Sequence, residues 1–143
     1  MTVQEASAAG PAPSRGRPVS LTLAAWAFIL VGAGGILKDV LPLAGPDRSS
    51  ALRGLLVEGA PMLAFIWLVR ALAVVGGAFA LRGRGWSRWL LAAWMVFHVG
   101  LSAFHSMGEA AAHVAIFSLL SYALFRPVAA AFFGRARSHA PGL

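Results

Sequence analysis

The sequence predicts an all-α membrane protein whose four transmembrane helices form an up-down antiparallel bundle. Its residues are 59% hydrophobic and 12% charged, whereas soluble domains are about 45–50% apolar and about 25% charged. The apolar residues gather in four stretches, each long enough to supply the ~20 residues that cross a ~30 Å hydrocarbon core. These stretches are continuously apolar and do not alternate, which favours helices over the strands of a membrane barrel.

The chain opens with residues 1–20, which are rich in Ala, Gly, Pro and Ser and predict a disordered cytoplasmic tail. The first helix is expected at about 21–39. Positive residues before an apolar run are also typical of a signal peptide. This run is longer than the apolar region of a signal peptide, however, and no A-x-A site follows it. We therefore expect a retained helix.

Three further helices are expected, and the links between them are short. Arg82–Gly85 joins the second helix to the third, and a turn near Met107–Gly108 joins the third to the fourth. Consecutive helices must therefore be antiparallel neighbours. Pro127 is expected to bend or end the membrane-buried part of the last helix. The transmembrane domain covers 21–133, its later helices lie at about 61–81, 86–106 and 109–133, and 134–143 form a cytoplasmic tail.

The link between the first two helices is long enough to hold a short element of its own. Within it, Ser49–Glu58 places Leu52, Leu55 and Leu56 on one side of a short helix. This position and period are those of a helix that lies on the membrane interface. A plain polar loop explains the same residues equally well, so both interpretations stay open.

The orientation follows from the tendency of Lys and Arg to gather in cytoplasmic loops. Arginine is concentrated in the N-terminal tail, in the link between the second and third helices and on the C-terminal side. The opposite side has fewer basic residues, and acidic residues offset them. We therefore expect a multi-pass protein of the inner (plasma) membrane with both termini cytoplasmic. The arginines of the expected cytoplasmic side are Arg15, Arg17, Arg82, Arg84, Arg88, Arg126, Arg135 and Arg137.

Small residues are expected to pack the helices together, because lipid tails give no hydrophobic drive between one helix and another. The expected packing residues are Gly32, Gly34 and Gly35 in the first helix, the pairs Ala73 with Gly77 and Gly76 with Ala80 in the second, and Ala111 with Ala115 in the fourth. Arg70 lies near the middle of the second helix and shares a face with Ala73 and Gly77, so it is expected to point into the bundle. It either bonds to helix-end carbonyls or one carboxylate, or contacts an anion or substrate.

Histidine and acidic side chains gather near the turn between the third and fourth helices. His98 and His105 lie two helical turns apart on one face, and Glu109 and His113 lie one turn apart. The turn brings His98 and His113 to depths that differ by only about 5 Å. The sequence therefore predicts a polar intramembrane cluster of His98, His105, Glu109, His113 and Arg70, with Lys38 and Asp39 at a similar depth.

Several chemistries use such a group of side chains. Imidazole and carboxylate bind zinc and other transition metals, two histidines bind haem iron, and both groups transfer protons. The spacing supports each chemistry and selects none, and hydrogen bonds that fix helix register explain the residues as well. No cofactor is predicted and no metal site is assigned. Haem or a transition metal stays an alternative, with His98, His105, His113 and Glu109 as candidate ligands.

The run GRGWSRWLLAAWMVFHVGLSAFHS, from Gly83 to Ser106, resembles a stretch of small bacterial membrane proteins that have four predicted helices and no assigned activity. The later Phe125-Arg126-Pro127, followed by Ala and Phe, is similar too. This resemblance covers the second half of the chain. It implies a bacterial inner-membrane location and transfers no catalytic residue.

These observations predict a small polytopic membrane protein that acts as an accessory or interaction component, and they favour a non-enzymatic role. One alternative is a small transporter or proton-linked channel. Another is a haem- or metal-binding redox anchor. The expected partners are the lipid bilayer and a second copy or a larger membrane complex. Nucleic acid is not expected, because the arginines lie at the ends of apolar segments. The chain has no cysteine, which excludes disulfides and thiolate chemistry.

Overall fold

The computed structural model describes residues 16–57 and 59–138, and this part of the chain is helical without a strand. The all-α prediction is confirmed. The predicted tail at 1–20 lies mostly outside the described residues, as do Glu58 and 139–143. The elements are α1 (Val19–Val40), η1 (Leu41–Ala44), α2 (Arg48–Val57), α3 (Ala60–Leu81), α4 (Gly85–Ala103), α5 (Met107–Phe125) and α6 (Pro127–Ser138).

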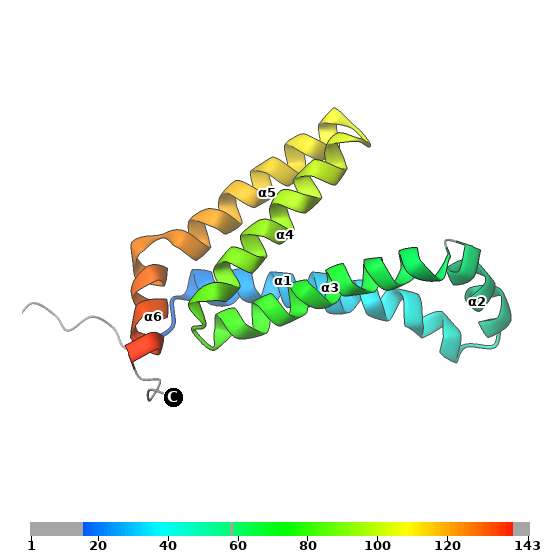
Figure 1. Ribbon diagram of the computed structural model, residues 1–143, viewed down its shortest axis with the longest axis horizontal. Helices are drawn as coiled ribbons and strands as arrows, with labels where there is room; N and C mark the ends of the chain where they lie inside the picture. The colour runs from blue at the N-terminus through cyan, green and yellow to red at the C-terminus, as the bar shows by residue number, and fades with distance from the viewer. Residues whose placement is uncertain (1–15, 58, 139–143) are drawn as a thin grey trace, which may run out of the picture.

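The helices form two antiparallel hairpins that meet at one end and diverge toward the other (Figure 1). The α1–α3 hairpin pairs the first and second predicted helices, and the α4–α5 hairpin pairs the third and fourth. The hairpins meet where α3 turns into α4, and α6 folds across that end (Figure 1). The antiparallel order is that of the predicted bundle, but the bundle is open at one end.

Three helical segments are long and apolar enough to cross a membrane: Val19–Ala44, Ala60–Leu81 and Met107–Phe125. These segments indicate a membrane protein. Helix α4 is not among them, because Arg88, His98 and several tryptophans lower its hydropathy. The predicted count of four spans is therefore not confirmed by length and composition.

The α1–α3 hairpin is closely packed because glycines remove side chains from its interface. A Cβ atom at Gly32 would lie 2.5 Å from the carbonyl oxygen of Arg70, and one at Gly77 would lie 2.6 Å from that of Ala25. Both distances are shorter than any normal contact, so the two backbones touch at these points. Close backbone approach increases the van der Waals attraction between membrane helices.

The junction of the hairpins holds most of the buried apolar side chains, including Leu21, Leu91 and Leu124. Gly83 ends α3 there with a φ of 74°, a conformation that glycine adopts at little cost. The amide of Gly83 donates to Ala80 and that of Arg84 donates to Phe79, which is the Schellman pattern of helix ends. This turn fixes where the second hairpin begins.

The helix ends differ from the sequence prediction at two places. The third helix stops at Ala103 instead of residue 106, because the Ser106 side chain accepts from the Glu109 amide and starts α5 at Met107. The fourth helix breaks at Arg126, as expected from Pro127, and the ψ of 153° at Arg126 is extended, as the residue before a proline prefers. Pro127 then begins α6, which extends to residue 138 and takes up part of the predicted C-terminal tail.

The link between α1 and α3 contains a helix, α2 (Arg48–Val57), in place of a plain loop. Leu52 and Leu56 on this helix are about half exposed, and so are not buried against the rest of the chain. Helix α2 lies beyond the far end of the α1–α3 hairpin (Figure 1). Its apolar face is free for contact with another surface.

Candidate functional site

Arg70 is held in place by α1. Its Nη1 atom donates to the carbonyl oxygen of Gly35 at 2.8 Å and pairs with the carboxylate of Asp39. Because Gly35 has no Cβ, the guanidinium fits against the α1 backbone, where a Cβ would lie 2.7 Å from Nε of Arg70. Trp67 donates its indole N–H to the same Asp39 carboxylate at 3.1 Å. Asp39 therefore joins α1 to α3, whereas its neighbour Lys38 is exposed.

A cavity of about 400 Å³ lies between the two hairpins, and α1, α3, α4 and α5 all contribute to its wall. We call it the central cavity. Its wall is apolar except for Arg70, His98, His113 and the indole N–H of Trp94. The lining residues are Ala27, Phe28, Val31, Gly35, Arg70, Trp94, Met95, His98, His113, Ile116 and Leu120. The structure thus brings three of the five predicted site residues to one cavity.

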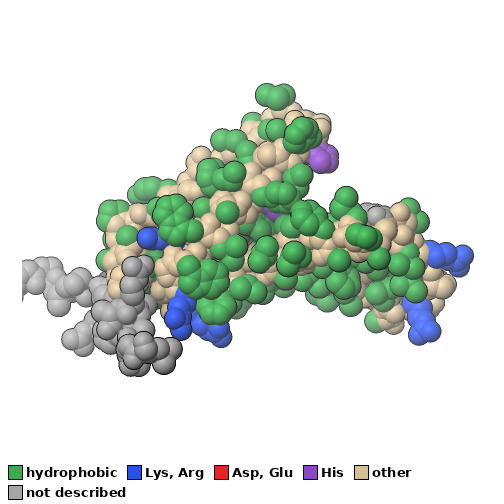
Figure 2. All heavy atoms as spheres, in the orientation of Figure 1, with side chains coloured by type: hydrophobic (Ala, Val, Ile, Leu, Met, Phe, Trp, Pro, Cys, Tyr) green, Lys and Arg blue, Asp and Glu red, His purple; other side chains and the backbone are tan. Residues whose placement is uncertain are grey.

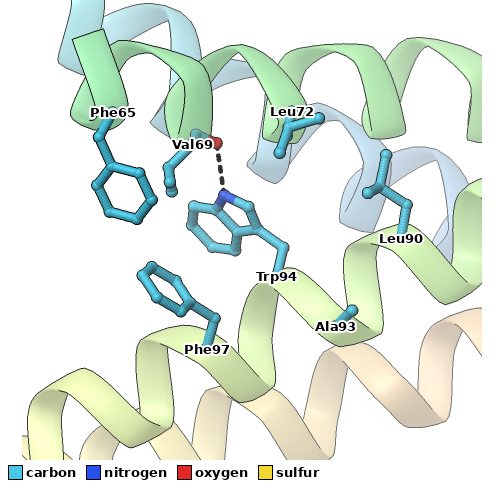
Figure 3. A pocket seen from close by; sticks show the side chains of 7 residues that line it. All are labelled: Phe65, Val69, Leu72, Leu90, Ala93, Trp94 and Phe97. Atoms are coloured by element: carbon cyan, nitrogen blue, oxygen red, sulfur yellow. Dashed lines mark hydrogen bonds between the residues drawn. The ribbon is translucent and has the colours of Figure 1, made fainter. Parts of the chain in front are cut away.

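Trp94 is the side chain that connects α4 to α3 beside this cavity. Its indole N–H donates to the carbonyl oxygen of Val69 at 2.7 Å, and the indole points from α4 toward α3 (Figure 3). One side of Trp94 borders a smaller apolar pocket, in which Phe65 and Phe97 face each other (Figure 3). The ring also stacks on His98, with centroids 3.7 Å apart. Trp94 therefore fixes the position of His98.

The histidines are oriented by their own helices. In His98 the Nδ1 atom lies 2.9 Å from the carbonyl oxygen of Trp94, and in His113 it lies 2.9 Å from that of Glu109. A carbonyl oxygen can only accept, so Nδ1 must hold the proton in each contact. In a neutral imidazole the other nitrogen, Nε2, is then an acceptor. His105 makes the same contact with Leu101 at 3.0 Å.

The remaining predicted residues lie nearer the α4–α5 turn. A shallow pocket of about 160 Å³ includes His98 and His113 again and adds Ser102, His105 and Glu109. His105 and Glu109 are exposed, while Ser102 is buried and donates to the carbonyl oxygen of Val99. The predicted cluster thus spans two pockets: His98 and His113 line the central cavity together with Arg70, and the same two histidines line the shallow pocket together with His105 and Glu109.

The positions of these residues bear on the predicted metal ligands. Within residues 16–57 and 59–138, no three His, Asp or Glu side chains are grouped closely enough to hold a metal ion. His98 and His105 lie before the start of α5, and Glu109 and His113 lie within α5. Their arrangement fits hydrogen bonding to a ligand better than metal coordination.

Three contacts of the site were not predicted from the sequence. Asp39 pairs with Arg70, Trp67 donates to Asp39, and Trp94 stacks on His98. Helical spacing gave a signal for two of them. Trp67 precedes Arg70 by three positions and Trp94 precedes His98 by four, which places each pair on one helix face. The Asp39 contact depends on the register of α1 against α3, which spacing alone does not give.

The ion pair at the central cavity is partly exposed. The side chains of Arg70 and Asp39 are 26% and 16% exposed. The space-filling view shows a hollow in the angle between the two hairpins, with histidine at its floor and hydrophobic side chains around it (Figure 2). The site is therefore reached from the side, between the hairpins. A comparison with protein-family models, curated proteins and solved structures finds no match.

Proposed function

We propose that the chain is a four-span inner-membrane protein that acts as an accessory component by binding a membrane-embedded molecule in the central cavity. Helix α4 would be the fourth span. It links two candidate spans, α3 and α5, through short turns. Its Trp94 bonds to Val69, near the middle of α3, which supports a position for α4 at the depth of α3. Arg88, which lowers the hydropathy of α4, faces the rings of Phe125 and Phe133 inside the chain.

The proposed orientation places both termini on the cytoplasmic side. Arg17 donates to the carbonyl oxygen of Leu81 at 2.9 Å, so the start of α1 and the end of α3 share one end of the molecule. Arg82 and Arg84 lie in the turn that follows Leu81. This grouping of arginines supports a cytoplasmic location for the junction of the hairpins.

The observation on which the binding proposal rests is the partial exposure of Arg70, which lies near the middle of α3, lines the central cavity and is paired with Asp39 near the end of α1. A charged pair inside a bilayer normally faces the protein interior or water, because contact with lipid tails is costly. Here the hairpins diverge and leave Arg70 partly uncovered at the wall of the central cavity. A molecule bound between the hairpins would cover it. The wall of the cavity, mostly apolar with a few convergent polar groups, is typical of a ligand site.

Neighbouring residues on α5 allow a direct test. Leu120 lines the central cavity, whereas Leu119 is 69% exposed on the outer surface. A photoreactive amino acid at Leu120 should form one discrete adduct in native membranes, identified by mass spectrometry. The same amino acid at Leu119 should label only bulk lipid. Identical, diffuse lipid labelling from both positions would contradict the binding role.

A further inference from the structure

The polar groups of the central cavity form a specific set of hydrogen-bonding partners. His98 and His113 both line the cavity and both have Nδ1 bonded to a carbonyl oxygen of their own helix. Each neutral ring therefore offers Nε2 as an acceptor. Arg70 uses Nη1 for Gly35 and Asp39, and a guanidinium has further N–H donors. A complementary ligand needs hydroxyl groups for the histidines and an oxygen acceptor for Arg70.

The cavity also favours an uncharged ligand. The carboxylate of Asp39 is paired with Arg70, so these two charges compensate each other. The described lining of the cavity contains no further Lys, Arg, Asp or Glu. An anion would gain little from a guanidinium that is already paired, and would lose its hydration in an apolar surrounding. A neutral molecule avoids this cost.

The shape of the wall favours a flat ring. Trp94 and His98 stack with their planes 26° apart, and Phe28 meets Trp94 edge-on with centroids 5.7 Å apart. Together they form an aromatic surface on one side of the cavity. A planar ring that stacks on this surface would gain aromatic contact beyond the burial of area. The volume of about 400 Å³ lies within the usual range of small-molecule sites, roughly 300–1,000 Å³.

From these groups we infer that the central cavity binds a neutral, lipid-soluble hydroquinone: a planar ring with two hydroxyl groups and an apolar tail. The hydroxyls donate to Nε2 of His98 and Nε2 of His113, and a ring oxygen accepts from Arg70. The tail leaves between the hairpins into the lipid. This inference rests on the proposed function, because it names the membrane-embedded molecule that the cavity holds.

The decisive probe is a matched pair of ligands. Radiolabelled decylhydroquinone and its di-O-methyl ether share the ring and the tail, but the ether has no O–H donor. With the protein in lipid nanodiscs, and with empty nanodiscs subtracted, decylhydroquinone should bind saturably. The ether should bind about tenfold more weakly, because the Nε2 acceptors of both histidines then stay unsatisfied. Equal binding of the two ligands would overturn the hydroxyl assignment.

The matched protein variants are His98→Phe, His113→Phe and the control His105→Phe, which keep a flat ring and remove the nitrogen acceptor. All three histidines bond to their own helix in the same way, but His105 is exposed and does not line the central cavity. His98→Phe and His113→Phe should each weaken decylhydroquinone binding about fivefold, because the hydroxyl then has no acceptor, and His105→Phe should leave it unchanged. Size-exclusion profiles and thermal stability identify any variant that fails to fold, and the second cavity variant then serves in its place.

The outcomes separate this inference from the proposed function. Saturable binding that depends on His98 and His113 supports the hydroquinone. No saturable binding, or binding that all three variants leave unchanged, overturns it. If a discrete adduct still forms at Leu120 in that case, the binding function stands with a different ligand. If the adduct is absent as well, both proposals are wrong.

Discussion

The two hairpins are built from similar helices but are held together in different ways. In the α1–α3 hairpin, glycines bring the backbones into contact, and the Asp39 carboxylate joins Trp67 and Arg70 across the interface. In the described part of the α4–α5 hairpin, no side-chain hydrogen bond joins one helix to the other. The histidines and Ser118 bond instead to carbonyl oxygens of their own helices. Aromatic contacts such as Trp89 with Phe125 connect the pair.

The difference indicates that one hairpin is a fixed support and the other can adjust. Backbone contact at the glycines and the pair of Asp39 with Arg70 restrict the geometry of the α1–α3 hairpin, and neither feature is present in the described part of the α4–α5 hairpin. The α4–α5 hairpin also diverges from α1–α3 beyond the junction (Figure 1). The histidines of the central cavity thus belong to the adjustable part and Arg70 belongs to the fixed part. Such a division suits a cavity that closes around an occupant.

The largest expected effect is that of alanine at the glycines of the fixed hairpin. Gly32→Ala and Gly77→Ala each place a methyl group 2.5–2.6 Å from a backbone carbonyl oxygen. The helices must then move apart, at a cost of about 3 kcal/mol, the upper end of the usual cost of overpacking. We expect a clear fall in unfolding free energy, measured by steric trapping or by thermal denaturation in detergent.

The controls for these glycines come from both hairpins. A Cβ at Gly34 of α1 or at Gly100 of α4 would have no neighbour within 4 Å. Gly34→Ala and Gly100→Ala should therefore be neutral or slightly stabilising, since alanine favours helix. If Gly100→Ala destabilised the protein as much as Gly77→Ala, the comparison between a fixed and an adjustable hairpin would be wrong.

A smaller effect is expected from Asp39→Asn. The variant leaves Arg70 without its counter-charge and weakens the bond from Trp67. Removing one partner of a fully buried pair costs about 3–5 kcal/mol. This pair is partly exposed, and exposure reduces that value, so we expect about 2 kcal/mol in a stability measurement. Asp47→Asn, at an exposed position outside the site, should change nothing. A neutral result for Asp39→Asn would mean that Arg70 needs only the Gly35 carbonyl.

Most of the fold was predictable because apolar length and short links determine which helices are neighbours. The helices at 61–81 and 86–106 were predicted close to their observed starts, Ala60 and Gly85. The divergence of the hairpins was not predictable. Crossing angles depend on how side chains meet, as Trp94 meets Val69, and periodicity does not contain that information.

The sequence predicted which residues belong to the site, but not which of them lie together. Helical spacing identified His98, His113 and Arg70, and the structure places all three around one cavity. Spacing also grouped His105 and Glu109 with them, but these two lie at the exposed end of the hairpin. Residues on one helix face can lie at different depths, and depth decides whether a residue faces the cavity or the end of the hairpin.

The smallest expected effect concerns the turn of the adjustable hairpin. Ser106, Met107, Gly108 and Glu109 have the Ser-x-x-Glu spacing of a capping box, and this signal could have given the start of α5 from the sequence. The Ser106 hydroxyl accepts from the Glu109 amide at 3.1 Å. Ser106→Ala removes that acceptor and should cost about 1 kcal/mol, visible as faster hydrogen exchange at the Glu109 amide.

The extent of that exchange distinguishes a local effect from a global one. If the α4–α5 hairpin adjusts independently, Ser106→Ala should speed exchange in the first turn of α5 and leave the amides around Gly32 and Gly77 unchanged. Ser118→Ala is the control, because the exposed Ser118 hydroxyl only donates to the Val114 carbonyl within α5. Equal acceleration in both hairpins after Ser106→Ala would show that they open as one cooperative unit. The central cavity would then close by a concerted movement of the whole bundle, and not by movement of α4 and α5 alone.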